Sequence, residues 1–202
     1  MKKKTILICG ATGFIERNVA EHFAKNSSFD VIGIYHQKPP FLHERMRWIQ
    51  ADLTDPAQVS TVLNGVDILI QAAAVTSGVL TIFSNPESHI TDNVVMNSYL
   101  FRLANEKRLE HVVFFSCTIM LQSSEHPIRE QDFDANKEMH PRYFGAGWTK
   151  VYLEKMCEFF SRIGSTKFSV IRHSNVYGPY DDFNPRTAQI IPSLIHKALN
   201  ER

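Results

Sequence analysis

The stretch Thr5–Lys25 constrains the fold more than any other, because a short apolar run passes through two glycines into a helical pattern. Residues Thr5–Cys9 are apolar on both faces, which is typical of a central parallel strand covered by helices on each side. Gly10 and Gly13 follow at once, and apolar residues then recur at helical spacing, at Phe14, Val19 and Phe23. Such a strand, turn and helix direct free backbone N–H groups and a positive helix end at one point. The stretch therefore predicts a binding site for a pyrophosphate.

The third position of this glycine turn departs from the expected pattern. A dinucleotide-binding turn carries a third glycine three residues after the second, where it lets the helix approach the sheet and the cofactor closely. This chain has Glu16 there, which adds bulk and a negative charge beside the expected pyrophosphate. A plain strand–turn–helix that binds no cofactor therefore stays open from this motif alone.

Composition places the chain among ordinary soluble globular proteins. Its 202 residues are 44% hydrophobic and 21% charged, which allows one domain with a sizeable core. The net charge of +1 gives no electrostatic case for nucleic acid or an anionic membrane as a partner. No stretch approaches the ~18 apolar residues of a membrane span, and the apolar run after Lys2–Lys4 is too short for a signal peptide. Cys9, Cys117 and Cys157 lie far apart without metal-type spacing, which fits a reduced cytoplasmic protein.

Strand-like and helix-like segments alternate along the rest of the chain. Further strands are expected at Phe29–Tyr35, Arg47–Gln50, Val66–Gln71, His111–Ser116 and Lys167–Arg172. Helices are expected at Pro56–Leu63 after an Asp55 N-cap, from Asn85 to Lys107, at Ala146–Arg162 and at Thr187–Leu199. Strands separated by helices pair in parallel through right-handed crossovers. The prediction is an α/β fold, a doubly wound parallel sheet of the Rossmann type with helices on both faces.

Ligands of open parallel sheets bind beyond the carboxyl ends of the strands, so the residues that follow each strand carry the functional information. His36, Gln37 and Lys38 follow the second strand, where an NAD-specific site usually carries an acid for the ribose 2′-hydroxyl. Basic groups suit a 2′-phosphate instead, which favours NADP over NAD. A histidine and a lysine in a solvated turn are the alternative.

Two further strand ends offer contacts to a nucleotide. Asp52 and Leu53 could meet the amino group and the ring of an adenine, and capping of a turn or helix is the alternative for Asp52. Ala72, Ala73 and Ala74 are small residues after a strand, which lets a flat or ribose-phosphate ligand approach the backbone. Both segments are therefore candidates for cofactor binding.

Four segments together resemble a known family. They are GATGFI at Gly10–Ile15, ADLTD at Ala51–Asp55, QAAAV at Gln71–Val75 and SNVYGPYDDFNP at Ser174–Pro185. The chain resembles, over its whole length, the extended short-chain dehydrogenase/reductases, which are NAD(P)-dependent epimerases, dehydratases and reductases of sugar nucleotides. The last segment is most similar to the GDP-fucose synthase branch. The resemblance implies a nucleotide-sugar substrate and hydride transfer at a sugar carbon.

The resemblance also implies a division of the chain. Residues 1–172 are expected to form the dinucleotide-binding domain, and residues 173–202 to begin a substrate-binding region whose C-terminal lobe is largely absent. The strand-end pattern and the resemblance together give the candidate cofactor-binding residues Gly10, Ala11, Thr12, Gly13, Phe14, Ile15, His36, Lys38, Asp52, Leu53, Ala72, Ala73, Ala74, Lys150 and His173. Asn175 resembles an asparagine that the family places at the nicotinamide–sugar boundary. Arg186 could meet a substrate phosphate, and a solvated loop arginine is the alternative.

The chemistry of the family uses a tyrosine and a lysine four residues apart on a long helix. The tyrosine exchanges a proton with the sugar, while the lysine lowers the tyrosine pKa and binds the nicotinamide ribose. Lys150 matches the lysine, but Ala146 stands where the tyrosine belongs. Tyr143 lies nearly two helical turns before Lys150. The alternative function is therefore a catalytically impaired member that binds a nucleotide or a nucleotide-sugar.

The family also places a serine or threonine after the fifth strand, where it orients the substrate oxygen. The family pattern puts Cys117 at this position, and a shift of one residue would install Ser116 or Thr118 instead. Cys117 as an independent nucleophile is a further alternative, although no histidine partner stands at a suitable position. The histidines show no metal-ligand spacing, so no metal is expected. As the resemblance implies, the two long helices are expected to pair across a homodimer, through Tyr99, Leu100, Phe101, Met156, Phe159 and Phe160.

Overall fold

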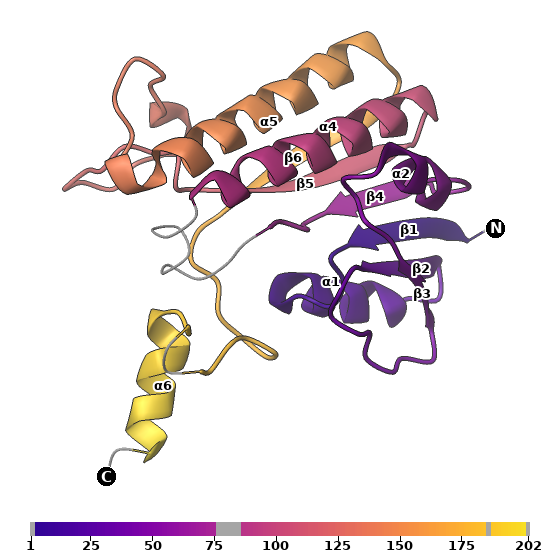
Figure 1. Ribbon diagram of the computed structural model, residues 1–202, viewed down its shortest axis with the longest axis horizontal. Helices are drawn as coiled ribbons and strands as arrows, with labels where there is room; N and C mark the ends of the chain where they lie inside the picture. The colour runs from indigo at the N-terminus through magenta and orange to yellow at the C-terminus, as the bar shows by residue number, and fades with distance from the viewer. Residues whose placement is uncertain (1–2, 76–85, 185–186, 201–202) are drawn as a thin grey trace.

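The computed structural model describes residues 3–75, 86–184 and 187–200. Within these ranges six parallel strands form a sheet in the order β3-β2-β1-β4-β5-β6 (Figure 1). The strands are β1 Lys4–Cys9, β2 Phe29–Tyr35, β3 Met46–Gln50, β4 Ile68–Gln71, β5 His111–Cys117 and β6 Lys167–His173. The chain reverses its direction of travel across the sheet between β3 and β4, which makes the sheet doubly wound. The predicted fold class is confirmed.

Helices lie on both faces of this sheet, and one further helix, α6, lies away from it (Figure 1). They are α1 Phe14–Ala24, α2 Pro56–Val62, α4 Thr91–Glu106, α5 Phe144–Ile163 and α6 Ile190–Asn200, with short 3₁₀ helices at Pro86–His89, Glu130–Asp132 and Pro141–Tyr143. α4 and α5 lie side by side over one face, and α1 lies against the other (Figure 1). The Asp55 carboxylate accepts hydrogen bonds from the backbone N–H groups of Ala57 and Gln58 at the start of α2, which confirms the predicted N-cap.

β1 lies at the centre of the sheet, and its side chains alternate between two cores. Ile6 and Ile8 pack with α1 on one face, whereas Leu7 and Cys9 join the core built with α4 and α5. All four side chains are 0% exposed. A strand covered on both faces has no polar alternation, which explains the continuous apolar run in the sequence.

The predicted starts of β4 and α4 are wrong by a few residues. β4 begins at Ile68 rather than Val66, because the preceding residues form a turn in which Gly65 has a φ of 72°. α4 begins at Thr91, after a 3₁₀ helix, so the predicted long helix is split near its start. Asn85, its predicted first residue, lies outside the described residues.

Two later helices also start at unexpected positions. α5 begins at Phe144, two residues earlier than predicted, because the 3₁₀ helix Pro141–Tyr143 runs directly into it. α6 begins at Ile190, because the backbone N–H of Thr187 closes a turn on Asn184 and does not start the helix. α6 lies apart from the sheet (Figure 1). None of the described helices is both long enough and apolar enough to cross a membrane.

The two long helices bury part of the surface that was expected to form a dimer. Leu100 and Phe101 are fully buried, and the Phe101 ring packs edge-on against Phe114 of β5 with 5.3 Å between ring centroids. Their assignment to a dimer interface is therefore wrong, because both residues belong to the core of one chain. Phe159 is exposed, while Tyr99, Met156 and Phe160 pack partly against the core.

Candidate functional site

The carboxyl ends of the strands meet at one edge of the sheet, and most of the predicted site residues lie there. Pairing of β1 with β4 puts Cys9 beside Gln71, and pairing of β5 with β6 puts Cys117 beside His173. The glycine turn after β1, the loop after β2, the alanines after β4 and the end of β5 therefore share this edge. In doubly wound sheets this is the edge at which ligands bind, next to the point where the strand order reverses.

The turn after β1 requires glycine at its first position. Gly10 has a φ of 73°, and a Cβ at Gly10 would lie 3.0 Å from the Cα of Ala73. Ala11 and Thr12 are buried, and the N–H of Ala11 donates to a carbonyl of β2 at 2.9 Å. Gly13 is the N-cap of α1 and brings no side chain to the helix start. The first turn of α1 therefore offers backbone N–H groups and a positive helix end, the combination that holds a pyrophosphate.

The side chain of Glu16 folds back over this turn. Its carboxyl carbon lies 3.0 Å from the point that a Cβ of Gly13 would occupy. Burial raises the pKa of Glu16 to about 7, against opposing effects of its own backbone amide and of the charges of Lys38 and Lys150. An ionisable group therefore fills the space that the missing side chain of Gly13 leaves open.

The Glu16→Gln variant is expected to be more stable than the wild type, by an amount that depends on pH. The folded protein holds the Glu16 proton more tightly than the unfolded chain, so wild-type stability falls as pH rises from 4.5 to about 7. The variant lacks this loss and should gain about 1–3 kcal/mol at about pH 8, but little at about pH 5. Urea unfolding at the two pH values measures the difference. The same gain at both values would contradict a proton-binding Glu16.

The residues after β2 and β3 divide into exposed basic groups and a capped turn. His36 and Lys38 are exposed, and Lys38 acts electrostatically on Glu16. The Asp52 carboxylate accepts hydrogen bonds from the hydroxyl and the N–H of Thr54, at 2.7 and 2.8 Å, and these bonds lower the Asp52 pKa. Leu53 is buried in the core behind this turn. Asp52 therefore has the contacts of a capping residue, and its contact with an adenine stays a prediction.

Amide side chains that were not among the predicted site residues hold the segment after β4. The Gln71 side chain donates to the carbonyl of Ala73 and to Oδ1 of Asn97, both at 3.0 Å. On α4, Asn93 accepts from the N–H of Val75 at 2.9 Å and donates to its carbonyl at 3.1 Å. The available signal was the spacing of two asparagines four residues apart, on one face of a helix. These bonds fix the backbone beside the predicted cofactor-binding residues Ala72, Ala73 and Ala74.

Lys150 lies against the end of β5. Its Nζ donates to the carbonyl of Phe115 at 3.0 Å and lies 4.9 Å from the centre of the Phe114 ring. Burial lowers the pKa of Lys150, and the neighbouring Cys117, Glu154 and Glu16 oppose this shift. Burial also raises the pKa of Cys117, so its thiol stays protonated. The nucleophile alternative for Cys117 therefore gains no support, because the thiolate is the reactive form.

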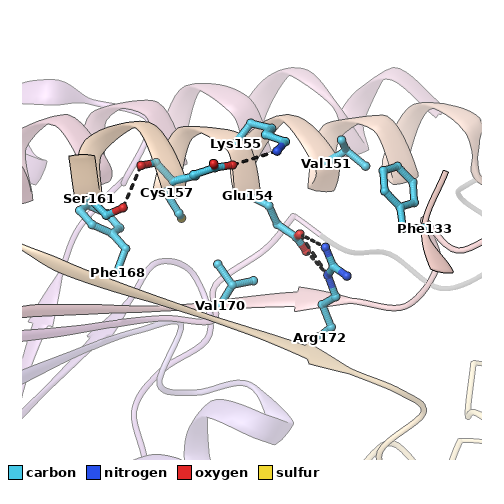
Figure 2. Close-up of a pocket in the computed structure, with 10 residues that line it drawn as sticks. Phe133, Val151, Glu154, Lys155, Cys157, Ser161, Phe168, Val170 and Arg172 are labelled. Carbon is cyan, nitrogen blue, oxygen red and sulfur yellow. Dashed lines mark hydrogen bonds and ion pairs between the residues drawn. The ribbon is translucent and has the colours of Figure 1, made fainter. Parts of the chain in front are cut away.

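The hydroxyl of Ser116 is engaged on the α5 face of the sheet. It donates to Oε1 of Glu154 at 2.5 Å. Glu154 also pairs with Arg172 of β6 at 2.6 Å, as Figure 2 shows. The Glu154 and Arg172 side chains are only 12% and 20% exposed, and they border a cavity of about 320 Å³ between α5 and β6. Ser116 therefore supports the packing of α5 on the sheet. Thr118, two residues further on, is partly buried beyond the end of the strand.

The position of the family tyrosine lies in the first turn of α5. Ala146 is partly buried and precedes Lys150 by four residues, so the two side chains share one face of the helix. Tyr143 precedes the first residue of α5, and its ring lies 5.6 Å from the His140 ring. Tyr143 therefore does not occupy the helical position four residues before Lys150.

The segment after β6 returns to the start of α1. The His173 ring lies 6.3 Å from that of Phe115, and Asn175 is exposed. Arg186 lies outside the described residues. Asn18 of α1 donates to a carbonyl of this segment, that of Pro179, at 2.9 Å. This contact was not predicted from the sequence, because it joins residues far apart in the chain.

The edge has the backbone features of a dinucleotide site, with one conflict. Gly10, Gly13 and the start of α1 form the cradle, and Lys150 lies within electrostatic reach of it, as its interaction with Glu16 requires. The conflict is the Glu16 carboxyl, which a pyrophosphate has to displace or neutralise. Across residues 3–75, 86–184 and 187–200, no group of three His, Cys, Asp or Glu side chains could hold a metal ion.

This fold defines an α/β protein of the doubly wound class, whose ligands bind at this edge of the sheet. A sequence model of the NAD dependent epimerase/dehydratase family matches residues 6–202, and the chain belongs to this family. The family resemblance of the sequence is thereby confirmed.

Curated relatives match nearly the whole of this chain at low identity. The dTDP-4-dehydro-6-deoxy-D-allose reductase of Streptomyces bikiniensis is 23% identical, over 96% of this chain and 63% of its own length. The GDP-L-fucose synthase of Azorhizobium caulinodans is 22% identical, over 97% of this chain and 59% of its own length. The chain thus spans about three fifths of these relatives.

Solved structures support the fold. The UDP-N-acetylglucosamine 4-epimerase of Methanobrevibacter ruminantium has a TM-score of 0.83 at 22% identity. The match covers 100% of this chain and 64% of the epimerase. The GDP-L-fucose synthetase of Naegleria fowleri bound to NADP has a TM-score of 0.77 at 20% identity, over 98% and 58%. The UDP-glucuronic acid 4-epimerase of Bacillus cereus, solved with NAD, has a TM-score of 0.78 at 21% identity, over 98% and 64%.

Proposed function

We propose that this chain carries the dinucleotide-binding part of an enzyme that transfers hydride at a carbon of a nucleotide-sugar. The observation that carries the proposal is the position of Lys150, held at the end of β5 by the Phe115 carbonyl and within electrostatic reach of the glycine turn. A lysine at this point can neutralise a phenolate or bind ribose hydroxyls. The names of the relatives, a reductase, a synthase and epimerases of nucleotide-sugars, support the substrate class.

The residues of the edge have separate roles in this proposal. The turn from Gly10 to Gly13 holds the pyrophosphate, and the backbone after β4 lies along the adjoining ribose. A nicotinamide dinucleotide supplies or accepts the hydride when it is bound. Lys150 holds a positive charge beside the sugar. We assign the strand-end hydroxyl to Thr118, because the Ser116 hydroxyl is already donated to Glu154.

A second candidate function is binding without efficient turnover. Ala146 is the observation that favours it, because the methyl group in the first turn of α5 cannot exchange a proton with a sugar. Loss of a general acid or base costs roughly 10²–10⁴ in rate. Dinucleotide binding is common to both functions, and turnover separates them.

We propose NADP as the cofactor, with Lys38 on the 2′-phosphate. No acidic residue stands directly after β2, and Lys38 is exposed there. Lys38→Ala is expected to weaken NADPH binding by about tenfold or more and NADH binding much less, because a hydrogen bond to a charged group contributes about 1.5–3 kcal/mol and about 1.4 kcal/mol corresponds to tenfold. Nicotinamide fluorescence titrations of the wild type and of Lys38→Ala with both dinucleotides measure this selectivity. Equal losses for NADPH and NADH would remove Lys38 from the 2′-phosphate.

The remaining assignments follow from the same function. We propose that residues 173–202 begin a substrate-binding region in which Asn175 and Arg186 meet the nucleotide-sugar. We also propose a homodimer through exposed residues of α4 and α5, and a cytoplasmic location, which suits the free thiols of Cys9, Cys117 and Cys157. Sedimentation analysis of the purified chain tests the dimer.

Titration of the wild-type chain with NADPH and NADH tests the proposed function. The expected result is a saturable change in nicotinamide fluorescence that ADP-ribose reverses, since ADP-ribose carries the same pyrophosphate. A chain that binds neither dinucleotide, at any pH at which it is folded, would remove the basis of the proposal.

A further inference from the structure

Glu16 occupies the part of the glycine turn that this type of site leaves empty. A glycine at the second position of such a turn lets the pyrophosphate approach the backbone closely. Here a Cβ on Gly13 would collide with the carboxyl group of Glu16. The carboxyl group therefore occupies the space through which a pyrophosphate would approach the backbone. The position of Glu16 in the first turn of α1 also puts a negative charge at the positive helix end. A carboxylate therefore takes both the space and the electrostatic environment of a pyrophosphate.

The charged groups around Glu16 come from several elements. Lys38 acts on it from the loop after β2, and Lys150 acts on it from α5. Cys117, at the end of β5, interacts with Lys150 rather than directly with Glu16. Both cations favour an anion at this point, whether it belongs to the protein or to a ligand.

Arg17, the next residue of α1, contacts side chains other than Glu16. Its guanidinium lies between the rings of Phe41 and Tyr180, at 4.1 and 3.6 Å, and its Nε donates to Glu21 at 2.9 Å. Arg17 therefore cannot neutralise Glu16 without giving up these contacts. The ionisation of Glu16 depends on burial, on its own backbone amide and on the two lysines.

We propose that the carboxyl group of Glu16 competes with the dinucleotide pyrophosphate for the start of α1, and that the dinucleotide binds with uptake of one proton. The proposal rests on the proposed function, because it concerns the same cofactor. The proton comes from solvent and converts the Glu16 carboxylate into a neutral carboxylic acid, so that one negative charge leaves the site as the pyrophosphate enters. Glu16 thereby makes cofactor affinity depend on pH near neutrality.

Affinity for NADH across the range from about pH 6 to about pH 8 tests this coupling. NADH is the probe because it lacks the 2′-phosphate of NADPH, which titrates at about pH 6. Wild-type affinity is expected to fall as pH rises, approaching tenfold for each pH unit above about 7. Calorimetry in two buffers with different ionisation enthalpies should detect uptake of about one proton at about pH 8.

Two variants separate Glu16 from its neighbours. Glu16→Gln keeps the size of the side chain together with Lys38, Lys150 and Cys117, so any pH dependence due to those groups remains in it. Its expected profile is nearly flat, without the proton uptake of the wild type. Glu16→Gly removes bulk and charge together, and it should bind NADH at least about tenfold more tightly than the wild type at about pH 8.

The outcomes distinguish this inference from the proposed function. If the wild type and Glu16→Gln bind NADH with the same pH profile and the same proton uptake, the inference is overturned and the dinucleotide site stands. If the wild type binds neither NADH nor NADPH at any pH at which it is folded, the inference and the proposed function both fall. A pH dependence that is confined to the wild type supports both.

Discussion

Ala146→Tyr is expected to raise hydride transfer by roughly 10²–10⁴, because it supplies the missing proton donor at a helical position four residues before Lys150. Lys150 should hold the pKa of the introduced phenol below its usual value of ~10. Turnover is followed by nicotinamide absorbance with NADPH and a panel of nucleotide-sugars. The phenol is followed by its ultraviolet absorbance during a pH titration, which needs no substrate.

The matched control combines Ala146→Tyr with Lys150→Met. Removal of the lysine charge should return the phenol to an ordinary pKa and abolish the gain in turnover. Tyr143 and the other tyrosines are present in every variant, so their titration cancels in the comparison. A phenol with an ordinary pKa beside intact Lys150 would contradict the geometry of the first turn of α5.

Glu154→Ala is expected to destabilise the fold by about 3 kcal/mol, which is the lower end for breaking a buried ion pair. The variant leaves the Arg172 guanidinium without its carboxylate and the Ser116 hydroxyl without its acceptor. The Glu154 side chain is only 12% exposed, so water replaces these contacts poorly. Denaturant unfolding, with the midpoint and the slope compared with wild type, measures the loss.

Glu158→Ala is the matched control, one helical turn further along α5. Like Glu154, Glu158 is paired with cations, here Lys155 and Arg162, but its side chain is 41% exposed. Exposed pairs contribute about 0–1 kcal/mol, so this variant should change stability little. Equal losses for Glu154→Ala and Glu158→Ala would contradict the view that burial makes the Glu154–Arg172 pair important.

The order of strands and helices, and hence the fold class, can be predicted from the local pattern of apolar residues. The apolar run of β1 and the alternation of strands and helices predict a doubly wound sheet, because a strand buried on both faces must lie between helices. Element boundaries are less predictable, since they depend on turns. The start of β4 is set by the turn at Gly65, and the start of α5 by the 3₁₀ helix before it.

Contacts between distant residues are the part that the sequence does not reveal. The strand-end pattern brings Ser116 to the correct edge, but only the structure places its hydroxyl on Glu154. The amide network of Gln71 with Asn97 joins β4 to α4 across twenty-six positions of sequence. The burial of Leu100 and Phe101 likewise depends on which face of α4 meets the sheet.

Glu16 shows how a departure in a motif gains meaning from structure. In the sequence it is a misplaced bulky acid, and nothing indicates where its carboxyl group lies. In the fold this group covers Gly13 and interacts with Lys38 and Lys150, which come from two other elements. The motif predicts the conflict, and the geometry gives it a testable form.

Hydrogen–deuterium exchange of the Glu16→Gly chain with and without NADPH tests most directly that a dinucleotide binds at this edge. The expected result is slower exchange in peptides that contain the glycine turn from Gly10 to Gly13 and the end of β5 at Phe115. Exchange in peptides around the exposed Phe159 of α5 should not change. Protection confined to the cavity between α5 and β6, or none at all, would contradict the assignment of the cofactor site.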